Sequence, residues 1–365
     1  MCLRGCEGRS KGGVGMSRSS GIWVLAFVCL VLVLASSMMN VTDPAPVASN
    51  PTAAPWSVLG DSTFTFAYGG DMGANGSHAP TALARLRADL ANLSFFLAVG
   101  DLSYSTQAGS EPSWCKFVNW SLKKPAQFPF ELLSGNHESS GAVLIDNFVK
   151  CEPNHVPGIV GGYGKEYYFD YPKSSPIARF ILISPALSFT YGGSYNYNSN
   201  TTHQRWLVHA IDSARGAGIK WIVVAMHKVC ISVGVMTCEI GQGLMDLLIQ
   251  KRVDLVIQGH DHDYQRTKQL SCAKAGVGRP ECVADANSPF VKGAGTVFTI
   301  CGTMGQSLSG VHMTTDSERV YFATAMGGNT SGYGYGFCRV TLTNTTLSMS
   351  TRFSGSYQDQ FKIGS

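Results

Sequence analysis

The sequence has few charged residues, because Asp, Glu, Lys and Arg together make up only 14% of its 365 positions. It also has no internal repeat, and its cysteines show no C-x-x-C spacing, which argues against the usual cysteine-rich zinc modules. No Pro/Ser-rich break follows residue 60. Hydrophobic residues reach 44%, which argues against disorder, so we expect one folded domain over residues 61–365.

The charge balance gives no reason to expect a nucleic-acid partner. The chain carries 28 Lys and Arg against 24 Asp and Glu, a formal net charge of +4. Four of these basic residues and one of the acidic residues lie within residues 1–37. Without that segment, 24 basic residues face 23 acidic ones, so the net charge of the remainder is only +1.

An uncharged apolar run, Ile22 to Ala35, follows the basic start of the chain. Its length and the small residues after it predict a secretory signal peptide within residues 1–37. Residues 21–41 together nearly reach the roughly 20 apolar residues that span a bilayer, so an uncleaved signal anchor is the alternative. Residues 38–60 are rich in Pro, Ala, Ser and Thr and predict a linker. We expect a secreted or lumenal protein, lysosome-like or vacuole-like in location, that meets a membrane only if the anchor is retained.

Cysteines and glycosylation motifs agree with export. Eight cysteines follow the leader, and an even number in an exported domain predicts disulfides, for which pairing in sequence order is the simplest arrangement. These cysteines are Cys115, Cys151, Cys230, Cys238, Cys272, Cys282, Cys301 and Cys338. Asn-x-Ser/Thr motifs, which predict a glycoprotein, occur at Asn40, Asn75, Asn92, Asn119, Asn200, Asn329 and Asn344.

Hydrophobic patterning alternates between strands and helices early in the domain and gives only strands later. Helical patterns cover 81–93, 203–215 and 244–249. This order predicts an α/β fold in which two mixed sheets lie between flanking helices, a four-layer α/β/β/α sandwich. The predicted strands cover 63–68, 95–99, 130–133, 167–171, 180–183, 221–225, 255–257, 296–300, 319–323, 338–342 and 347–352, the last two around a turn at 343–344.

Five of these strands lead into residues that can bind metals. In alternating sheets, ligands gather beyond the carboxyl ends of the strands. The two histidines after the strand at 255–257 stand two residues apart, so on an extended backbone both face one side. Taken singly, Gly-Asp after a strand is usually a turn and a lone histidine usually packs in a core, but the joint occurrence predicts a metal site. The candidate ligands are Asp71, Asp101, Asn136, His227, His260 and His262.

The mixture of donors indicates the kind of metal. Three oxygen ligands and three imidazoles suit transition metals rather than calcium, which takes oxygen ligands alone. Six side chains exceed what one tetrahedral ion binds, so two ions that share the carboxylate of Asp101 are the economical interpretation. Two ions about 3.5–4 Å apart stabilise both the attacking and the leaving oxygen in phosphoryl transfer.

The sequence blocks around these residues resemble those of a known family. The blocks are Gly70-Asp71-Met72-Gly73, Gly100-Asp101-Leu102-Ser103-Tyr104, Gly135-Asn136-His137-Glu138, Val224-Ala225-Met226-His227 and Gly259-His260-Asp261-His262. As a set they resemble the five blocks of the purple acid phosphatases, a branch of the calcineurin-like metallophosphoesterases. The resemblance runs from about residue 64 to 262 and is to a single-domain form of the family.

The resemblance implies a ferric ion and a second, divalent ion, which is iron, zinc or manganese in the family. The implied ligands of Fe(III) are Asp71, Tyr104, His262 and the shared Asp101. The implied ligands of the second ion are Asp101, Asn136, His227 and His260. Tyr104 decides the subclass, because a phenol with an ordinary pKa of about 10 ionises only beside a strong Lewis acid. The alternative for Tyr104 is a packed aromatic ring.

The implied reaction is the hydrolysis of phosphate monoesters, small molecules or phosphoproteins, by in-line attack of a metal-bound hydroxide. His137 would donate a proton to the leaving oxygen or bind phosphate, with Glu138 holding it, unless it only orders its loop. One departure concerns this acid: the family often has a further histidine after the fourth block, whereas residues 228–259 contain none. The alternatives are a phosphodiesterase or nucleotide pyrophosphatase on the same fold, and an inactive secreted metal-binding surface protein.

Overall fold

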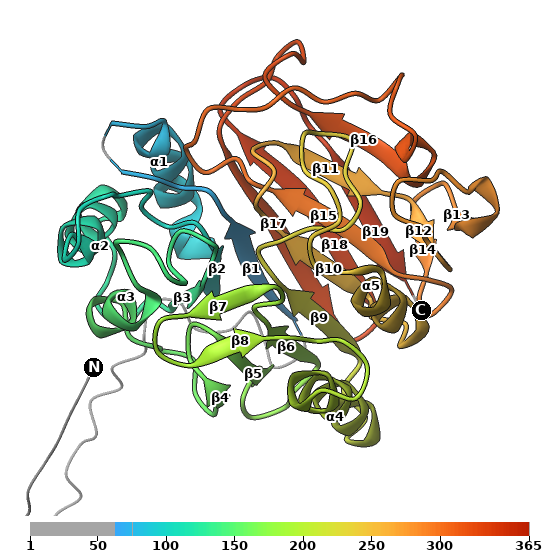
Figure 1. The fold of residues 1–365 in the computed structure, drawn as a ribbon, viewed down its shortest axis with the longest axis horizontal. Coiled ribbons are helices and arrows are strands. Elements are labelled where there is room, and N and C mark those ends of the chain that lie inside the picture. The colour runs from blue at the N-terminus through green and yellow to red at the C-terminus, as the bar shows by residue number, and fades with distance from the viewer. Residues whose placement is uncertain (1–62, 75, 365) are drawn as a thin grey trace, which may run out of the picture. The chain divides into compact units, whose positions relative to one another are not determined.

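The computed structural model describes residues 63–74 and 76–364. The expected signal peptide or anchor at 1–37 and the expected linker at 38–60 lie outside the described residues. The described residues form two mixed β-sheets that pack face to face, with helices on the outer face of each sheet (Figure 1). The predicted four-layer α/β/β/α sandwich is therefore confirmed.

The first sheet contains the strands that lead into the first three predicted blocks. β1, β2 and β3 are neighbours and run parallel, and β17 pairs antiparallel with the other side of β1. These three strands are buried along nearly their whole length, as expected where helices cover one face and a second sheet covers the other. In spatial order the strands are β14 (Phe290–Val291), β19 (Gln360–Gly364), β18 (Thr346–Phe353), β17 (Gly336–Thr343), β1 (Thr63–Gly69), β2 (Phe95–Val99) and β3 (Phe130–Leu133).

The second sheet contains the strands that lead into the other two blocks. Its strands in spatial order are β16 (Phe322–Met326), β11 (Tyr264–Thr267), β15 (Val297–Cys301), β10 (Leu255–Gln258), β9 (Trp221–Ala225), β6 (Ala178–Leu182), β5 (Glu166–Tyr171) and β4 (Val160–Gly162). β6, β9, β10 and β15 run parallel, so β9 and β10 end at the same edge of the sheet. Two small sheets pair β7 (Leu187–Phe189) with β8 (Gly193–Tyr195) and β12 (Gln269–Leu270) with β13 (Val283–Asp285).

The two sheets meet through one apolar layer rich in aromatic rings. Phe66 of β1 stacks on Phe95 of β2, with ring centroids 5.3 Å apart. Phe180 of the second sheet meets Phe66 edge-on at 4.8 Å between centroids. Aromatic pairs of this kind contribute roughly 0.5–1.5 kcal/mol beyond their buried area. This packing fixes one sheet against the other, and with it the positions of the strand ends.

Helices cover the outer face of each sheet. α1, α2 and α3 pack on the first sheet, and α4 and α5 pack on the second (Figure 1). Each long helix turns an apolar stripe inward, which in α4 consists of Leu207, Ala210, Ile211 and Ala214. The helices are α1 (Ala79–Asp89), α2 (Glu111–Leu122), α3 (Ile145–Cys151), α4 (Thr202–Gly216) and α5 (Gln242–Gln250), with 3-10 turns η1 (Leu90–Asn92), η2 (Pro280–Cys282) and η3 (Arg319–Tyr321).

Most of the predicted elements are present within a few residues of their expected bounds. The predicted strands at 95–99, 130–133 and 221–225 have the expected bounds, and the predicted hairpin is formed by β17 and β18. The predicted strand at 319–323 is partly wrong, because η3 occupies its first three residues and β16 begins only at Phe322. The prediction misses α2 and α3, because α2 is rich in aromatic and polar residues of modest helix propensity and α3 has only 7 residues.

The disulfides follow the sequence order of the cysteines in three of the four expected pairs. The bonded pairs are Cys115–Cys151, Cys230–Cys238 and Cys272–Cys282. Disulfides in this number indicate an extracytoplasmic location. The fourth pair consists of buried thiols, in which Cys338 Sγ lies 3.0 Å from Cys301 Sγ. Over the residues that the structure describes, every helix is too short or too polar to cross a bilayer.

Candidate metal centre

The carboxyl ends of the parallel strands bring the predicted ligand loops of both sheets together. β1, β2 and β3 lead into the loops predicted to supply oxygen ligands, and β9 and β10 lead into the loops predicted to supply histidines. Backbone hydrogen bonds join neighbouring loops: Asp71 N donates to Gly100 O at 3.1 Å, and Gly259 N donates to His227 O at 3.1 Å. The crevice beyond such strand ends is the usual ligand site of an open α/β sheet.

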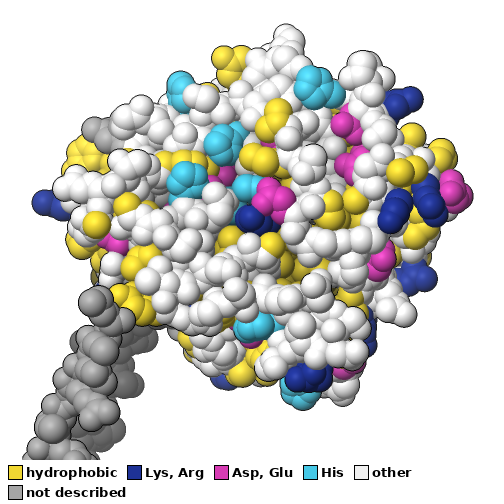
Figure 2. Space-filling model, in the orientation of Figure 1, with side chains coloured by type: hydrophobic (Ala, Val, Ile, Leu, Met, Phe, Trp, Pro, Cys, Tyr) yellow, Lys and Arg dark blue, Asp and Glu magenta, His cyan; other side chains and the backbone are white. Residues whose placement is uncertain are grey.

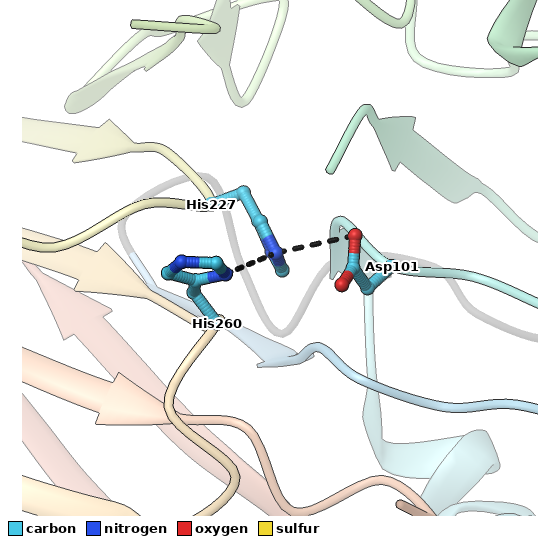
Figure 3. Close-up of side chains that lie close together, drawn as sticks. All are labelled: Asp101, His227 and His260. Atoms are coloured by element: carbon cyan, nitrogen blue, oxygen red, sulfur yellow. Dashed lines mark hydrogen bonds and ion pairs between the residues drawn. The ribbon is translucent and has the colours of Figure 1, made fainter. Parts of the chain in front are cut away.

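Asp101, His227 and His260 form one cluster at this edge (Figure 3). The Nε2 atom of His227 lies 3.2 Å from Asp101 Oδ1 and 3.2 Å from His260 Nδ1. One ligand atom from each residue lies within 4.8 Å of the other two, a spacing that a single cation between them could bridge. All three residues are buried, with at most 8% of their surface exposed.

Asp71, Tyr104 and His262 form a second cluster. The Tyr104 hydroxyl donates to Asp71 Oδ1 at 2.8 Å and lies 2.9 Å from His262 Nε2. His262 Nε2 is in turn 3.5 Å from Asp71 Oδ1. Asp71 also joins this cluster to the first, because its Oδ2 accepts the backbone N–H of His260 at 2.8 Å. The predicted ligands therefore fall into two linked groups, one that contains a phenol and one that contains two imidazoles.

The backbone adopts unusual conformations to reach this geometry. Asp71, Asp101, Tyr104 and His260 have positive φ angles of 62°, 50°, 55° and 73°, in a region that residues other than glycine rarely occupy. Such conformations persist where the surrounding structure enforces them, and they gather at functional sites. The loops are also crowded, because a Cβ on Gly135 would lie 2.0 Å from Asp101 Oδ1.

Hydrogen bonds behind the first cluster orient its imidazole rings. His227 Nδ1 lies 2.9 Å from the carbonyl oxygen of Val99, to which it donates, and this leaves Nε2 to face Asp101. His260 Nε2 lies 2.5 Å from Glu239 Oε1, which leaves Nδ1 to face His227. Metal-binding histidines are commonly held in this way by a carbonyl or a carboxylate on the far ring nitrogen.

The charges in the clusters stabilise one another. Burial alone would raise the pKa of Asp101, but His227 and His137 outweigh it and hold that pKa well below its usual range. Burial alone would lower the pKa of His227, but the carboxylates of Asp101 and Asp71 raise it to about 9. Burial, together with the same carboxylates, raises the pKa of the Tyr104 hydroxyl above its ordinary value. A proton on His227 thus balances the buried carboxylates, and a bound cation would do the same.

Asn136 and His137 lie on the loop after β3, beside Asp101. The backbone N–H of His137 donates to Asp101 Oδ1 at 3.1 Å. The Oδ1 atom of Asn136 is buried and has no hydrogen-bond partner within residues 63–74 and 76–364, as expected of an oxygen that faces a cation. The His137 ring lies against Tyr104, with ring centroids 4.3 Å apart, and 42% of its side chain is exposed. His137 therefore borders both the clusters and the solvent.

Two glutamates contribute to the site in ways that the sequence does not predict. Glu138 does not serve as the expected support of the His137 ring; its carboxylate accepts the backbone N–H groups of Leu102 and Gly135. Glu239 contacts His260, and its only signal in the sequence is its place after Cys238, in the segment that lacks a histidine. Figure 2 shows histidine side chains gathered on this face of the molecule, with acidic and basic side chains directly beside them.

Paired clusters of oxygen and imidazole donors at the ends of strands from two packed sheets make this edge a candidate site for two metal ions. The model of the calcineurin-like phosphoesterase family matches residues 64–264. Because this match covers more than half of the chain, the protein belongs to that family.

Similarity to individual proteins is more distant. The chain is 28% identical over 241 residues to an uncharacterised protein of Mycobacterium tuberculosis, covering 58% of this chain and 42% of that protein. It is 22% identical over 241 residues to purple acid phosphatase 1 of Ipomoea batatas, covering 63% and 49%. The structure of purple acid phosphatase PPD1 from yellow lupin (Lupinus luteus) seeds shares the fold with a TM-score of 0.62 at 18% identity, covering 83% and 54%. The chain thus spans about half the length of these relatives.

Proposed function

We propose that this metallophosphoesterase is an acid phosphatase of the purple type, which hydrolyses phosphate monoesters at a ferric–divalent centre. The observation that carries the proposal is the position of Tyr104, whose hydroxyl lies 2.8 Å from Asp71 and 2.9 Å from His262. A half-buried phenol between a carboxylate and an imidazole is a donor set suited to a ferric ion, which favours oxygen ligands of high charge.

The two clusters fit two ions with one shared ligand. Asp71, Tyr104, His262 and Asp101 would hold Fe(III). Asp101, Asn136, His227 and His260 would hold the divalent ion, which is iron, zinc or manganese. The bound ions would acidify water and neutralise the charge of the phosphate. The buried Oδ1 of Asn136 has no hydrogen-bond partner among the described residues, which supports its place in the second set.

Ionisation of the Tyr104 phenol would reveal a bound ferric ion. Burial and the carboxylates of Asp71 and Asp101 oppose ionisation of this phenol in the protein alone. A strong cation at the phenolic oxygen reverses that balance, because it stabilises the phenolate. Phenolate-to-iron charge transfer would then give the protein a visible colour.

His137 would hold and donate the proton that the leaving oxygen needs. Its backbone is fixed by the hydrogen bond to Asp101, and its ring lies against Tyr104. At 42% exposure its side chain can meet a substrate that approaches from solvent. A proton held at the edge of the site serves general acid catalysis, which contributes roughly 10²- to 10⁴-fold.

The proposed substrates are phosphate monoesters on small molecules or on phosphoproteins. We propose a secreted or lumenal location, and attachment to a membrane if the N-terminal segment is retained as an anchor. The three disulfides support the exported location.

The test uses protein from a secretory host, measured for metal content, visible absorption and activity on a phosphate monoester and a diester. We expect iron with one further divalent ion, a visible band, and a preference for the monoester. Tyr104→Phe should abolish the band, because the phenolate is lost. A colourless, iron-free protein that is active would contradict the ferric centre, and a preference for the diester would favour a phosphodiesterase. A metal-replete protein inert towards both esters would contradict the enzymatic role.

A further inference from the structure

The loop between β9 and α5 carries His227, and beyond it the sequence has no histidine up to residue 259. The disulfide between Cys230 and Cys238 closes this loop, and Glu239 follows it directly. The backbone N–H of Glu239 donates to the carbonyl oxygen of Val229 at 3.0 Å, so the two ends of the loop lie together. Covalent and backbone bonds therefore fix Glu239 just beyond the end of β9.

Both carboxylate oxygens of Glu239 are engaged. Oε1 lies 2.5 Å from His260 Nε2, and Oε2 lies 2.5 Å from Lys228 Nζ. The side chains of Lys228 and Glu239 are 15% and 31% exposed, so solvent only partly screens their attraction. The ammonium group thus balances the charge of the carboxylate and leaves Oε1 to the imidazole.

The contact with Glu239 decides which nitrogen of His260 faces the clusters. An imidazole that donates from one nitrogen offers a lone pair on the other. With Nε2 donating to Glu239, His260 presents Nδ1 as the ligand atom, 3.2 Å from His227 Nε2. A carboxylate in this position also makes the ring a stronger ligand.

We infer that Glu239 is a positioning residue for the divalent ion, held in place by the Cys230–Cys238 disulfide and by Lys228. The inference rests on the proposed binuclear centre and gives the disulfide-closed loop a part in it. The loop supplies the carboxylate that orients His260. In this chain the segment in which the family often has a histidine therefore provides a residue that holds a metal ligand in place. Opening the disulfide, as in a Cys230→Ser, Cys238→Ser double variant, should weaken metal binding in the same direction as removing Glu239.

The test compares the full-length protein, purified with its metals, with Glu239→Ala and Glu239→Gln. Each protein is dialysed against graded concentrations of a chelator, and the divalent ion that remains is measured by elemental analysis. Glu239→Ala should lose the ion at a chelator concentration roughly 10- to 100-fold lower than the unchanged protein. Glu239→Gln should restore most of the difference, because its amide oxygen still accepts a hydrogen bond from His260 Nε2.

Asp212→Ala is a matched control, because Asp212 in α4 also pairs with a lysine, Lys251, at 2.7 Å. This variant should hold the ion as tightly as the unchanged protein. Melting of the metal-stripped proteins separates orientation from folding: stripped Glu239→Ala loses the contacts to His260 and Lys228 but should remain folded at the temperature of the dialysis. A stripped Glu239→Ala that is unfolded at that temperature would assign the loss of metal to unfolding and overturn the inference.

The outcomes also separate this inference from the proposed function. If Glu239→Ala keeps the divalent ion as tightly as the unchanged protein does, the inference fails while the metal centre stands. If the unchanged protein binds no divalent ion, the metal centre itself fails, and the inference fails with it.

Discussion

Glu138 accepts a hydrogen bond from the backbone N–H of Leu102 at 2.7 Å, which joins the loop after β3 to the loop after β2. Its other oxygen accepts the N–H of Gly135 at 3.0 Å. The side chain is fully buried, and burial together with the Asp101 carboxylate raises the pKa of Glu138 to about 8. Glu138 thus joins the two loops that carry Asp101 and Asn136.

Replacing Glu138 by alanine should destabilise the protein. The variant leaves two buried N–H groups without an acceptor, each of which costs roughly 1–3 kcal/mol. Denaturant unfolding with the disulfides intact should therefore show a loss of at least about 2 kcal/mol. Glu281→Ala removes an exposed glutamate and should change stability little. A Glu138→Ala variant as stable as the Glu281→Ala control would contradict this role.

His137→Ala should reduce the turnover of alkyl phosphates far more than the turnover of aryl phosphates. An alkoxide is a poor leaving group that needs a proton, whereas a phenolate of low pKa leaves with little help. The loss on alkyl esters should reach roughly 10²- to 10⁴-fold, measured as kcat by steady-state kinetics. His209→Ala, which removes an exposed histidine from α4, is the control. Equal losses on both ester classes would show that His137 orders its loop and does not donate the proton.

The fold is predictable because it follows from patterns local in sequence. The strands at 95–99, 130–133 and 221–225 are buried on both faces, so each appears as a continuous apolar run of the right length. Alternation with helical patterns then requires parallel strands and helices on the outer faces. Edge strands such as β4 and β14 escape prediction, because they are short and partly exposed and have little hydrophobic pattern.

The sequence predicts only those site residues that closely follow a buried strand. Sequence position is enough to suggest that Asp101 and His227 face one crevice, since both follow buried strands. It says nothing of Glu239 and His260, whose contact spans 21 residues and depends on how the loop after β9 folds back. Such contacts come from tertiary packing and leave no periodic trace in the chain.

Glu131 should make the protein less stable as the pH rises towards neutrality. Burial raises its pKa to about 7, whereas in an unfolded chain a glutamate titrates near 4.3. Between these values the folded protein keeps a proton that the unfolded chain has released. The contribution of Glu131 to stability is therefore greatest below about pH 4.5, and it falls by about 3 kcal/mol in all as the pH rises to about 7.

Glu131→Gln should remove this pH dependence. Glutamine keeps an acceptor for the backbone N–H groups of His155 and Val156, which Glu131 Oε1 binds at 2.9 Å and 3.2 Å. Urea unfolding at pH values from 4.5 to 7, with Glu281→Gln as the control, measures the difference in slope. If Glu131→Gln loses stability with pH as steeply as the control, Glu131 does not carry the effect.

Cys301 and Cys338 should form a fourth disulfide in the exported protein. Cys301 ends β15 in the second sheet, Cys338 lies in β17 of the first, and their sulfur atoms are 3.0 Å apart in the buried layer between the sheets. Thiol–disulfide exchange with an oxidant of the secretory pathway would take one hydrogen from each thiol and join the sulfurs across that layer. Alkylation under denaturing, non-reducing conditions, followed by peptide mass mapping, should recover the two cysteines in one cross-linked peptide pair, as for Cys115 and Cys151. Recovery of both as alkylated thiols would show that the pair stays reduced and that no disulfide joins the sheets at this point.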